Sequence, residues 1–243
     1  MSYYDIVIKL KQTNKITIKS DFLVGFLISK RVSPYISAFY INRKIVPNTI
    51  TIHMIISGII GAIFFSFSNI YFKLIGAFFM QLWFILDCSD GEVARETKIF
   101  SKYGKELDYT AHIINHPLFS ISLLISMLEV QKYNNIFIIT IFFLIICLDL
   151  YSRNIYAFYM IKNLKEKEIQ FKEKKVSFFK KIKEKIKRII ELFTIYPNFI
   201  LFSTLLYFFN TDIIIFYALL NILFTFIMLV RESLLWINKI KVD

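Results

Sequence analysis

The sequence predicts an all-α integral membrane protein with six transmembrane helices, preceded by a short N-terminal interfacial amphipathic helix. Hydrophobic residues make up 56% of the 243 residues, with 27 phenylalanines and a mean hydropathy of +0.56. A water-soluble domain of this length has too little interior to hide so much apolar surface. The apolar residues are also gathered into runs close to the ~20 residues that cross a bilayer. Lipid is therefore expected to be part of the solvent of this chain.

The N-terminal segment, residues 1–45, is predicted to be cytoplasmic and interfacial. Residues 1–19 are polar and carry several lysines, which is typical of a cytoplasmic lead. Two short apolar stretches follow, at residues 20–33 and 35–40, and basic residues flank both. Because they are too short to span a bilayer, we expect them to form helices along the lipid headgroups.

The remaining residues, 46–243, are predicted to form one six-helix membrane domain. Pro47-Asn48-Thr49 is typical of a helix start, with Asn48 as the N-cap. The expected spans are residues 50–67, 72–86 with a helical continuation into an acidic stretch, 105–127, 136–160, 196–209 and 213–230.

The positions of the basic residues predict the orientation and exclude one class of partner. The loops on one side, residues 68–73, 129–135 and 210–212, contain only two lysines, whereas the other side holds nearly all the remaining lysines and arginines. Cytoplasmic loops are enriched in these residues, so both termini and the acidic stretch are predicted to face the cytoplasm, and we expect a bacterial inner membrane. The net charge is +12, but the basic residues flank the apolar runs and form no separate soluble domain. No nucleic-acid partner is therefore expected.

The longest connector, residues 162–191, is dense in lysine. Apolar residues recur three to five apart in its second half, which suits an amphipathic helix on an anionic leaflet. A simple block of charge that sets the topology explains the composition equally well.

One stretch carries chemistry, because acidic residues recur there at helical spacing. It reads D-x-x-D-G-x-x-A-R-x8-G-x3-D-x3-H, from Asp87 to His112. Residues three or four apart share a helix face, so Asp87 and Asp90 line the end of one span. Asp108 and His112 likewise line the start of the next span. Antiparallel neighbours joined by a short loop bring these two faces together.

Three carboxylates so close repel one another unless a cation holds them. A site rich in oxygen donors suits Mg²⁺ or Mn²⁺ rather than zinc. We therefore expect a divalent metal at the end of the second span and the start of the third.

The pattern, with a fourth Asp in place of His112, resembles the signature of the CDP-alcohol phosphotransferase (CDP-alcohol phosphatidyltransferase) family of integral membrane enzymes. The approach to the first span, from Lys30 to Thr51, and the six-span layout are similar as well. The resemblance implies that residues 46–243 are a catalytic domain. It implies a transferase that cleaves a CDP-alcohol, moves the phospho-alcohol (phosphatidyl-type) group to an acceptor hydroxyl and releases CMP, in phospholipid or glycopolymer synthesis.

The resemblance also implies roles for individual residues. The expected metal ligands are Asp87, Asp90 and Asp108, and the residues expected to shape the CDP site are Gly91, Ala94, Arg95 and Gly104. The last Asp of the family is held to deprotonate the acceptor alcohol. His112 stands at that position here, and a histidine can do the same task because it titrates near neutral pH.

Three further polar residues of the predicted spans leave alternatives open. Asp149 and Arg153 lie four apart in the fourth span, where they form either an intrahelical ion pair or, with Arg153, part of an acceptor pocket. His116, one turn beyond His112, is either a partner of that residue or a packed core histidine.

The sequence also allows two other functional classes, a scaffold and a transporter. The exchange at His112 also suits a catalytically inactive membrane scaffold of the same fold that binds metal and CDP. A transporter is less consistent, because the acids lie at helix ends and not near the bilayer midplane. The expected partners are a CDP-alcohol donor, an alcohol acceptor and membrane lipids, and the resemblance adds a homodimer. The sequence does not distinguish among donors or acceptors.

Overall fold

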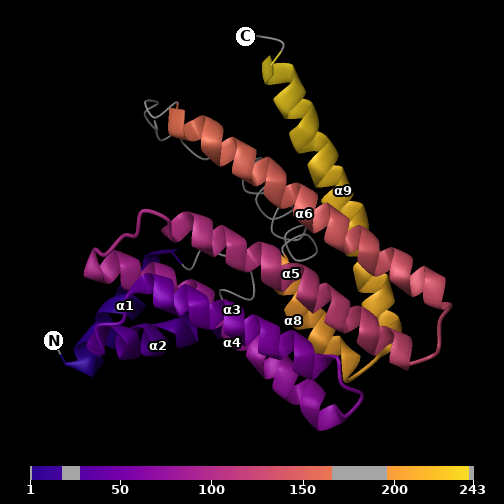
Figure 1. Ribbon diagram of the computed structural model, residues 1–243, viewed down its shortest axis with the longest axis horizontal. Helices are drawn as coiled ribbons and strands as arrows, with labels where there is room; N and C mark the ends of the chain where they lie inside the picture. The colour runs from indigo at the N-terminus through magenta and orange to yellow at the C-terminus, as the bar shows by residue number, and fades with distance from the viewer. Residues whose placement is uncertain (1, 18–27, 166–195, 241–243) are drawn as a thin grey trace, which may run out of the picture.

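The computed structural model describes residues 2–17, 28–165 and 196–240, and the regular structure in them is helical (Figure 1). The helices in chain order are α1 (Tyr3–Thr17), α2 (Lys30–Asn42), α3 (Pro47–Phe65), α4 (Ile70–Thr97), α5 (Gly104–Glu129), α6 (Asn135–Lys165), α8 (Tyr196–Tyr207) and α9 (Thr211–Ile240).

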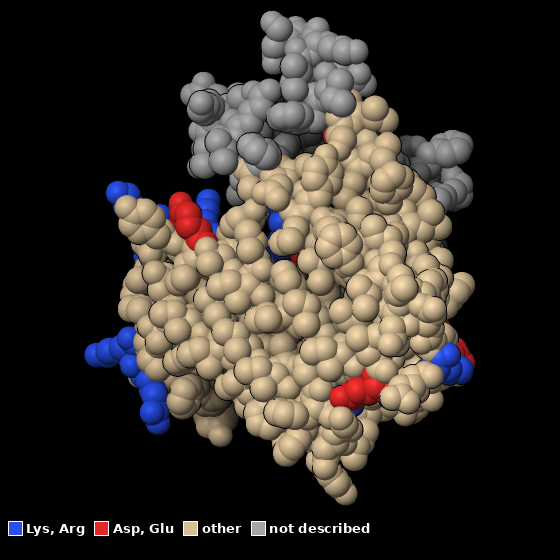
Figure 2. Space-filling view, turned by 45° about the vertical axis from the view of Figure 1, so that its right-hand side comes forward, with Lys and Arg blue, Asp and Glu red and all other residues tan. Residues whose placement is uncertain are grey.

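Five helices in the described part of the chain are long and apolar enough to cross a bilayer. They are α3, α4, α5, residues Asn135–Ile155 of α6 and residues Thr211–Leu234 of α9. Figure 2 shows a broad uncharged face, with the charged side chains near its margins, as expected for contact with lipid. The chain is therefore an integral membrane protein, and its described part is all-helical.

The predicted fifth span, at residues 196–209, corresponds to α8, which has only 12 residues. This length is short of the ~20 residues that cross a bilayer. The described residues thus supply five candidate spans, and α8 packs between α4, α5 and α9 as a shorter apolar helix.

The N-terminus differs from the prediction. Residues 3–17, expected to be a polar lead, form α1, because Ile6, Val7 and Leu10 make an apolar stripe that packs with Ala38 of α2. Lysines dominate the composition of this segment, so composition alone predicts a polar segment and not a packed helix. Most of the helix expected at residues 20–33 and of the connector at 162–191 lies outside the described residues.

The start of α3 also differs. Val46, with an extended backbone, is the N-cap, and Pro47 takes the first helical position. Proline suits that position because its missing N–H has no partner there in any helix. Asn48 therefore lies inside the first turn, and its Nδ2 donates to Ser101 Oγ at 2.9 Å, so that it contacts the loop before α5.

The helices α3, α4 and α5 form the centre of the bundle, and they run side by side in Figure 1. Two glycines bring the backbones of α3 and α4 close together. A Cβ atom on Gly76 would lie 2.4 Å from Phe65 N, and one on Gly61 would lie 2.9 Å from Met80 N. Small residues allow this approach in lipid, where packing rather than water drives helix association.

The end of α4 and the start of α5 are joined by a short loop. Lys98 ends α4 in the left-handed conformation, with φ 59°, and Gly104 begins α5. The helices α1 and α2 cover this end of the bundle, and α2 packs on α4 (Figure 1). The acidic stretch therefore comprises the end of α4, the loop and the start of the antiparallel α5.

Candidate active site

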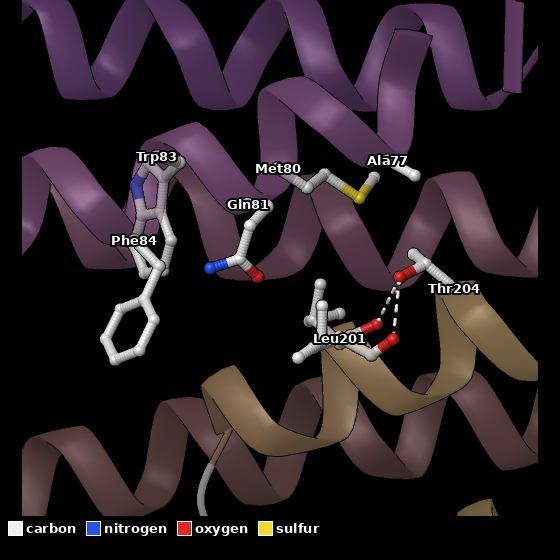
Figure 3. A pocket seen from close by; sticks show the side chains of 8 residues that line it. Ala77, Met80, Gln81, Trp83, Phe84, Leu201 and Thr204 are labelled. Atoms are coloured by element: carbon white, nitrogen blue, oxygen red, sulfur yellow. Dashed lines mark hydrogen bonds between the residues drawn. The ribbon is translucent and has the colours of Figure 1, made fainter. Parts of the chain in front are cut away.

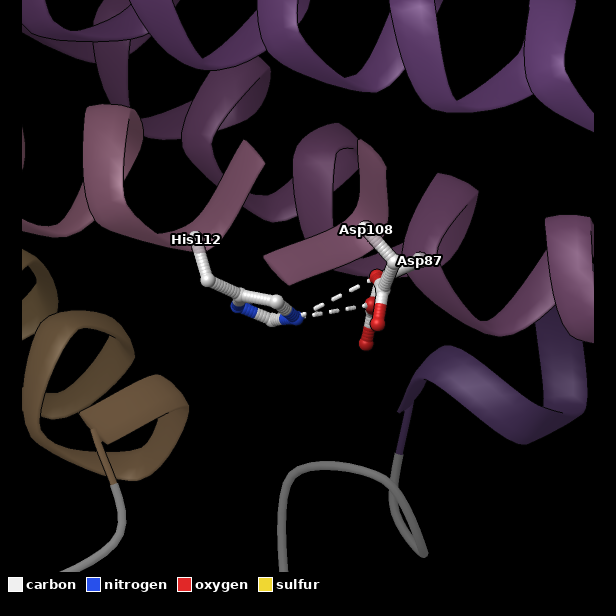
Figure 4. A group of neighbouring side chains, drawn as sticks. All are labelled: Asp87, Asp108 and His112. Carbon is white, nitrogen blue, oxygen red and sulfur yellow. Dashed lines mark ion pairs between the residues drawn. The ribbon is translucent and has the colours of Figure 1, made fainter. Parts of the chain in front are cut away.

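Three side chains of the acidic stretch meet between α4 and α5. His112 Nε2 lies 3.2 Å from Asp87 Oδ1 and 3.5 Å from Asp108 Oδ1, and Figure 4 shows the imidazole edge facing both carboxylates. One ligand atom from each residue lies within 4.8 Å of the others. The two carboxylates of this group are donors that suit a divalent ion such as Mn²⁺ or Mg²⁺.

Asp90 belongs to the same cluster of charge but has a different partner. It lies within electrostatic reach of both Asp87 and Asp108. Thr51 of α3 donates a hydrogen bond from its Oγ1 to Asp90 Oδ2 at 2.9 Å. The threonine therefore orients the carboxylate, a contribution from α3 that the acidic pattern alone did not indicate.

The residues predicted to shape the CDP site lie along the end of α4 and the start of α5. Arg95 is exposed, and its guanidinium lies over Gly91, where a Cβ atom would be 2.9 Å from Nη1. Ala94 is half-buried on the turn between them. A Cβ atom on Gly104 would make only ordinary contacts, 3.5 Å from Asn48 Oδ1. The protein itself therefore does not require a glycine at position 104.

A second group of polar side chains lies behind His112, deeper in the bundle. His112 Nδ1 is 3.2 Å from His116 Nε2, and His116 Nδ1 is 3.0 Å from Asp149 Oδ2. Arg153 Nε lies 3.4 Å from the same Asp149 oxygen, so the intrahelical ion pair is present. Arg153 Nη2 also lies 2.9 Å from both ring nitrogens of His116. His116 is thus a partner of His112 as well as a fully buried residue.

Aromatic rings enclose the two histidines. Trp83 meets both imidazoles edge-on, with ring centroids 5.2 Å from His112 and 5.4 Å from His116. Tyr196 of α8 stacks on His116 at 3.8 Å with an interplanar angle of 12°. Its hydroxyl lies 2.6 Å from Ser120 Oγ.

Glu92, within the acidic stretch, faces away from the cluster and binds the N-terminal helices. It is 3% exposed. It accepts hydrogen bonds from Ser33 Oγ at 2.5 Å, Ser37 Oγ at 2.6 Å and Asn14 Nδ2 at 2.8 Å. This carboxylate therefore holds α1 and α2 against the end of α4. Its role could not be read from the sequence, because α1 was not expected.

Two hollows lie beside the site. The first, between α4 and α8, has a volume of about 10 Å³, which is room for a single water molecule, and Figure 3 shows Met80 of α4 and Leu201 of α8 on opposite sides of it. The second, of about 580 Å³, lies among α1, α2, α3 and α4 and has a mainly apolar lining. Within it Tyr40 Oη is 2.9 Å from His53 Nδ1, and burial raises the pKa of Tyr40 above its ordinary value.

These features define an all-helical membrane protein with a cluster of acids and histidine at the ends of two spans. The family model of the CDP-alcohol phosphatidyltransferases matches residues 44–236. The chain belongs to this family, and the resemblance stated from the acidic stretch is confirmed. No curated protein matches the chain significantly.

Proposed function

We propose that the chain is a membrane transferase that cleaves a CDP-alcohol and transfers the phospho-alcohol group to an acceptor hydroxyl, with release of CMP. The observation that carries the proposal is the meeting of Asp87, Asp108 and His112 between α4 and α5, within the region that matches the family. The reaction belongs to phospholipid or glycopolymer synthesis. The donor is either CDP-diacylglycerol with a soluble acceptor or a small CDP-alcohol with a lipid or glycan acceptor.

In this proposal Asp87, Asp90 and Asp108 hold a divalent ion, Mg²⁺ or Mn²⁺. Such an ion, when bound, neutralises charge on the pyrophosphate and on the leaving CMP. The gathered carboxylates support this role, because their mutual repulsion is relieved by a cation. Thr51 keeps Asp90 turned toward the cluster through its hydrogen bond of 2.9 Å.

Gly91, Ala94, Arg95 and Gly104 form the binding surface for CDP in the same proposal. Arg95 is exposed at the end of α4, where a guanidinium can pair with phosphate oxygens. Arg153 forms an ion pair with Asp149. Its role in the acceptor pocket stays a prediction of its own.

His112 is proposed as the general base. Its Nε2 faces the carboxylates, and this nitrogen must be unprotonated when an acceptor hydroxyl passes its proton to the ring. The acceptor oxygen then bonds to the phosphorus that carries the alcohol, and the bond from that phosphorus to CMP breaks. A positioned base contributes roughly 10²–10⁴ in rate.

The arrangement in the membrane completes the proposal. We infer six spans, a catalytic domain at residues 46–243, an interfacial segment at residues 1–45, a homodimer, and a bacterial inner membrane with both termini in the cytoplasm. The concentration of lysine and arginine on one side of the apolar runs supports the orientation.

The test is CMP release by the purified full-length protein in detergent, with Mg²⁺ or Mn²⁺ and a panel of CDP-alcohols and acceptors. We expect release with at least one pair, and His112→Ala should abolish turnover while CDP-alcohol binding persists. Unchanged turnover in His112→Ala would remove the assignment of the base.

The presence of histidine where the family has its last Asp favours one alternative, a scaffold that binds metal and CDP without turnover. That alternative predicts metal-dependent CDP binding and no CMP release from any pair of substrates.

A further inference from the structure

We propose that the larger hollow, the groove of about 580 Å³ among α1, α2, α3 and α4, binds one anionic glycerophospholipid of the bilayer. The phosphate of this lipid contacts Lys11 and Arg43, and one acyl chain lies along α3 and α4. The ligand is a resident lipid and not the CDP-alcohol, so the proposal does not depend on the proposed function.

The helix α3 separates the groove from the acidic cluster. Thr51 faces the cluster, where it donates to Asp90 at 2.9 Å, whereas His53 lines the groove. Residues two apart on a helix differ in direction by about 200°, so these two side chains point to opposite sides of α3. A molecule in the groove is therefore held apart from the carboxylates of the acidic stretch.

The lining of the groove suits an acyl chain. Its volume falls within the ~300–1,000 Å³ of typical ligand pockets. The part of the lining that belongs to the candidate spans α3 and α4 includes Ile56, Ile60, Phe79 and Leu82. A chain in such a groove gains dispersion contacts on several sides, whereas lipid on a flat helix face gains them on one side. The groove therefore favours one held chain over the lipid that surrounds the bundle.

Two cations lie over aromatic rings of the groove lining. Lys11 Nζ is 4.2 Å from the centre of the Tyr35 ring and donates to its hydroxyl at 2.5 Å. The Arg43 guanidinium is 4.7 Å from the centre of the Phe39 ring. Because the two rings are one helical turn apart on α2, they are neighbours on its surface, and a single headgroup can contact both cations.

The charge of these cations is not balanced by the protein. Within the described part of the chain, no carboxylate forms an ion pair with Lys11 or Arg43. A phosphate supplies the missing negative charge through charge-assisted hydrogen bonds. A zwitterionic lipid would also bring a positive amine toward the two cations, so an anionic lipid is the better match.

A polar pair in the groove matches the ester region of such a lipid. Tyr40 Oη lies 2.9 Å from His53 Nδ1, and both residues line the groove. His53 is exposed and lies about 9 Å along α3 from its start at Pro47. A headgroup layer is roughly 5–8 Å thick, so a helix that begins at the membrane surface places this ring where headgroups give way to hydrocarbon. An ester oxygen at that level can accept a hydrogen bond from the pair, which lowers the cost of a polar ring facing lipid.

The test is lipid binding to the full-length protein in detergent, measured by native mass spectrometry. The probes are phosphatidylglycerol and phosphatidylcholine with the same acyl chains. The double variant Lys11→Gln/Arg43→Gln removes both cations, and Ile60→Trp fills the apolar part of the groove. Lys102→Gln is the matched control, because Lys102 also lies over a tyrosine ring, 5.2 Å from the centre of Tyr103, but neither residue lines the groove.

We expect one phosphatidylglycerol to bind at least about fivefold more tightly than phosphatidylcholine. A basic residue near an anionic headgroup contributes roughly fivefold in affinity, so the double variant should lose about 25-fold and Lys102→Gln almost nothing. Ile60→Trp should abolish one-to-one binding of either lipid. Equal affinity for the two lipids, or equal losses in the double variant and Lys102→Gln, shows only lipid surrounding the bundle and overturns the proposal.

A second measurement uses the parent protein alone, so it holds even if a variant fails to fold. A phosphatidylglycerol with a photoreactive acyl chain should cross-link to residues of the groove such as Phe39, Ile56 or Phe79. Unlabelled phosphatidylglycerol should compete with it. Cross-links spread over the outer faces of the bundle contradict the proposal. Stronger competition by CDP-diacylglycerol than by phosphatidylglycerol would assign the groove to the donor substrate and likewise overturn it.

Discussion

Glu92 offers a stringent test of how the N-terminal helices are held over the site. The perturbation is Glu92→Ala, which removes the acceptor of three hydrogen bonds at 2.5, 2.6 and 2.8 Å from α1 and α2. Hydrogen bonds to a charged group are worth about 1.5–3 kcal/mol each. Asn14 keeps a second acceptor, the carbonyl oxygen of Lys30 at 3.2 Å, which offsets part of the loss.

We therefore expect Glu92→Ala to destabilise the docking of α1 and α2 by about 3–5 kcal/mol, the range seen when one partner of a buried charged network is removed. The assay is hydrogen exchange of the full-length protein, followed by mass spectrometry of α1. Since every 1.4 kcal/mol is tenfold, protection of α1 amides should fall by roughly 100-fold or more.

The control is Glu96→Ala, one turn further along α4. Glu96 also contacts α1, through Lys9 at 2.5 Å, but the lysine side chain is 54% exposed. Exposed ion pairs contribute about 0–1 kcal/mol, so α1 should lose at most a small factor of protection. Equal loss of protection in the two variants would refute the account of Glu92 as the anchor.

Three further predictions concern the cluster and the bundle. Asp108→Asn should weaken Mn²⁺ binding, measured by electron paramagnetic resonance, by at least about tenfold, because ligating carboxylates supply the charge that holds the ion; unchanged affinity would exclude Asp108 as a ligand. Thr51→Ala should weaken the same binding by a few-fold, since it removes one hydrogen bond worth about 1 kcal/mol, whereas Thr51→Ser should not. Gly76→Ala should destabilise the fold by about 1–3 kcal/mol through overpacking, because its Cβ would lie 2.4 Å from Phe65 N; a thermal midpoint in detergent equal to that of the parent would contradict the tight α3–α4 contact.

The meeting of Asp87 with Asp108 and His112 could be predicted from the sequence, since helical spacing and a short loop determine it. The network behind it could not. His116 and Asp149 lie 33 residues apart on different helices, and only the register of α5 against α6 brings them together. Local pattern carries no information about that register.

The N-terminal region differs from its prediction for a related physical reason. The stripe of Ile6, Val7 and Leu10 is short, and the lysines around it dominate the composition. The composition of this segment therefore predicts a solvated polar lead and not a helix. Its stability depends on tertiary partners, namely the apolar face of α2 and the carboxylate of Glu92, rather than on its own helix propensity. The helix α8 ends at Tyr207, two residues before the predicted end of that span, because a run of apolar residues does not mark where a helix ends.

The most direct test of the central claim is the position of a bound ion. A crystal structure of the full-length protein with Mn²⁺ and a CDP-alcohol, with the ion located by anomalous scattering, should show the peak between the carboxylates of Asp87 and Asp108, beside Asp90 and next to the pyrophosphate. A peak at another place, or an ion and nucleotide bound without contact to α5, would contradict the account.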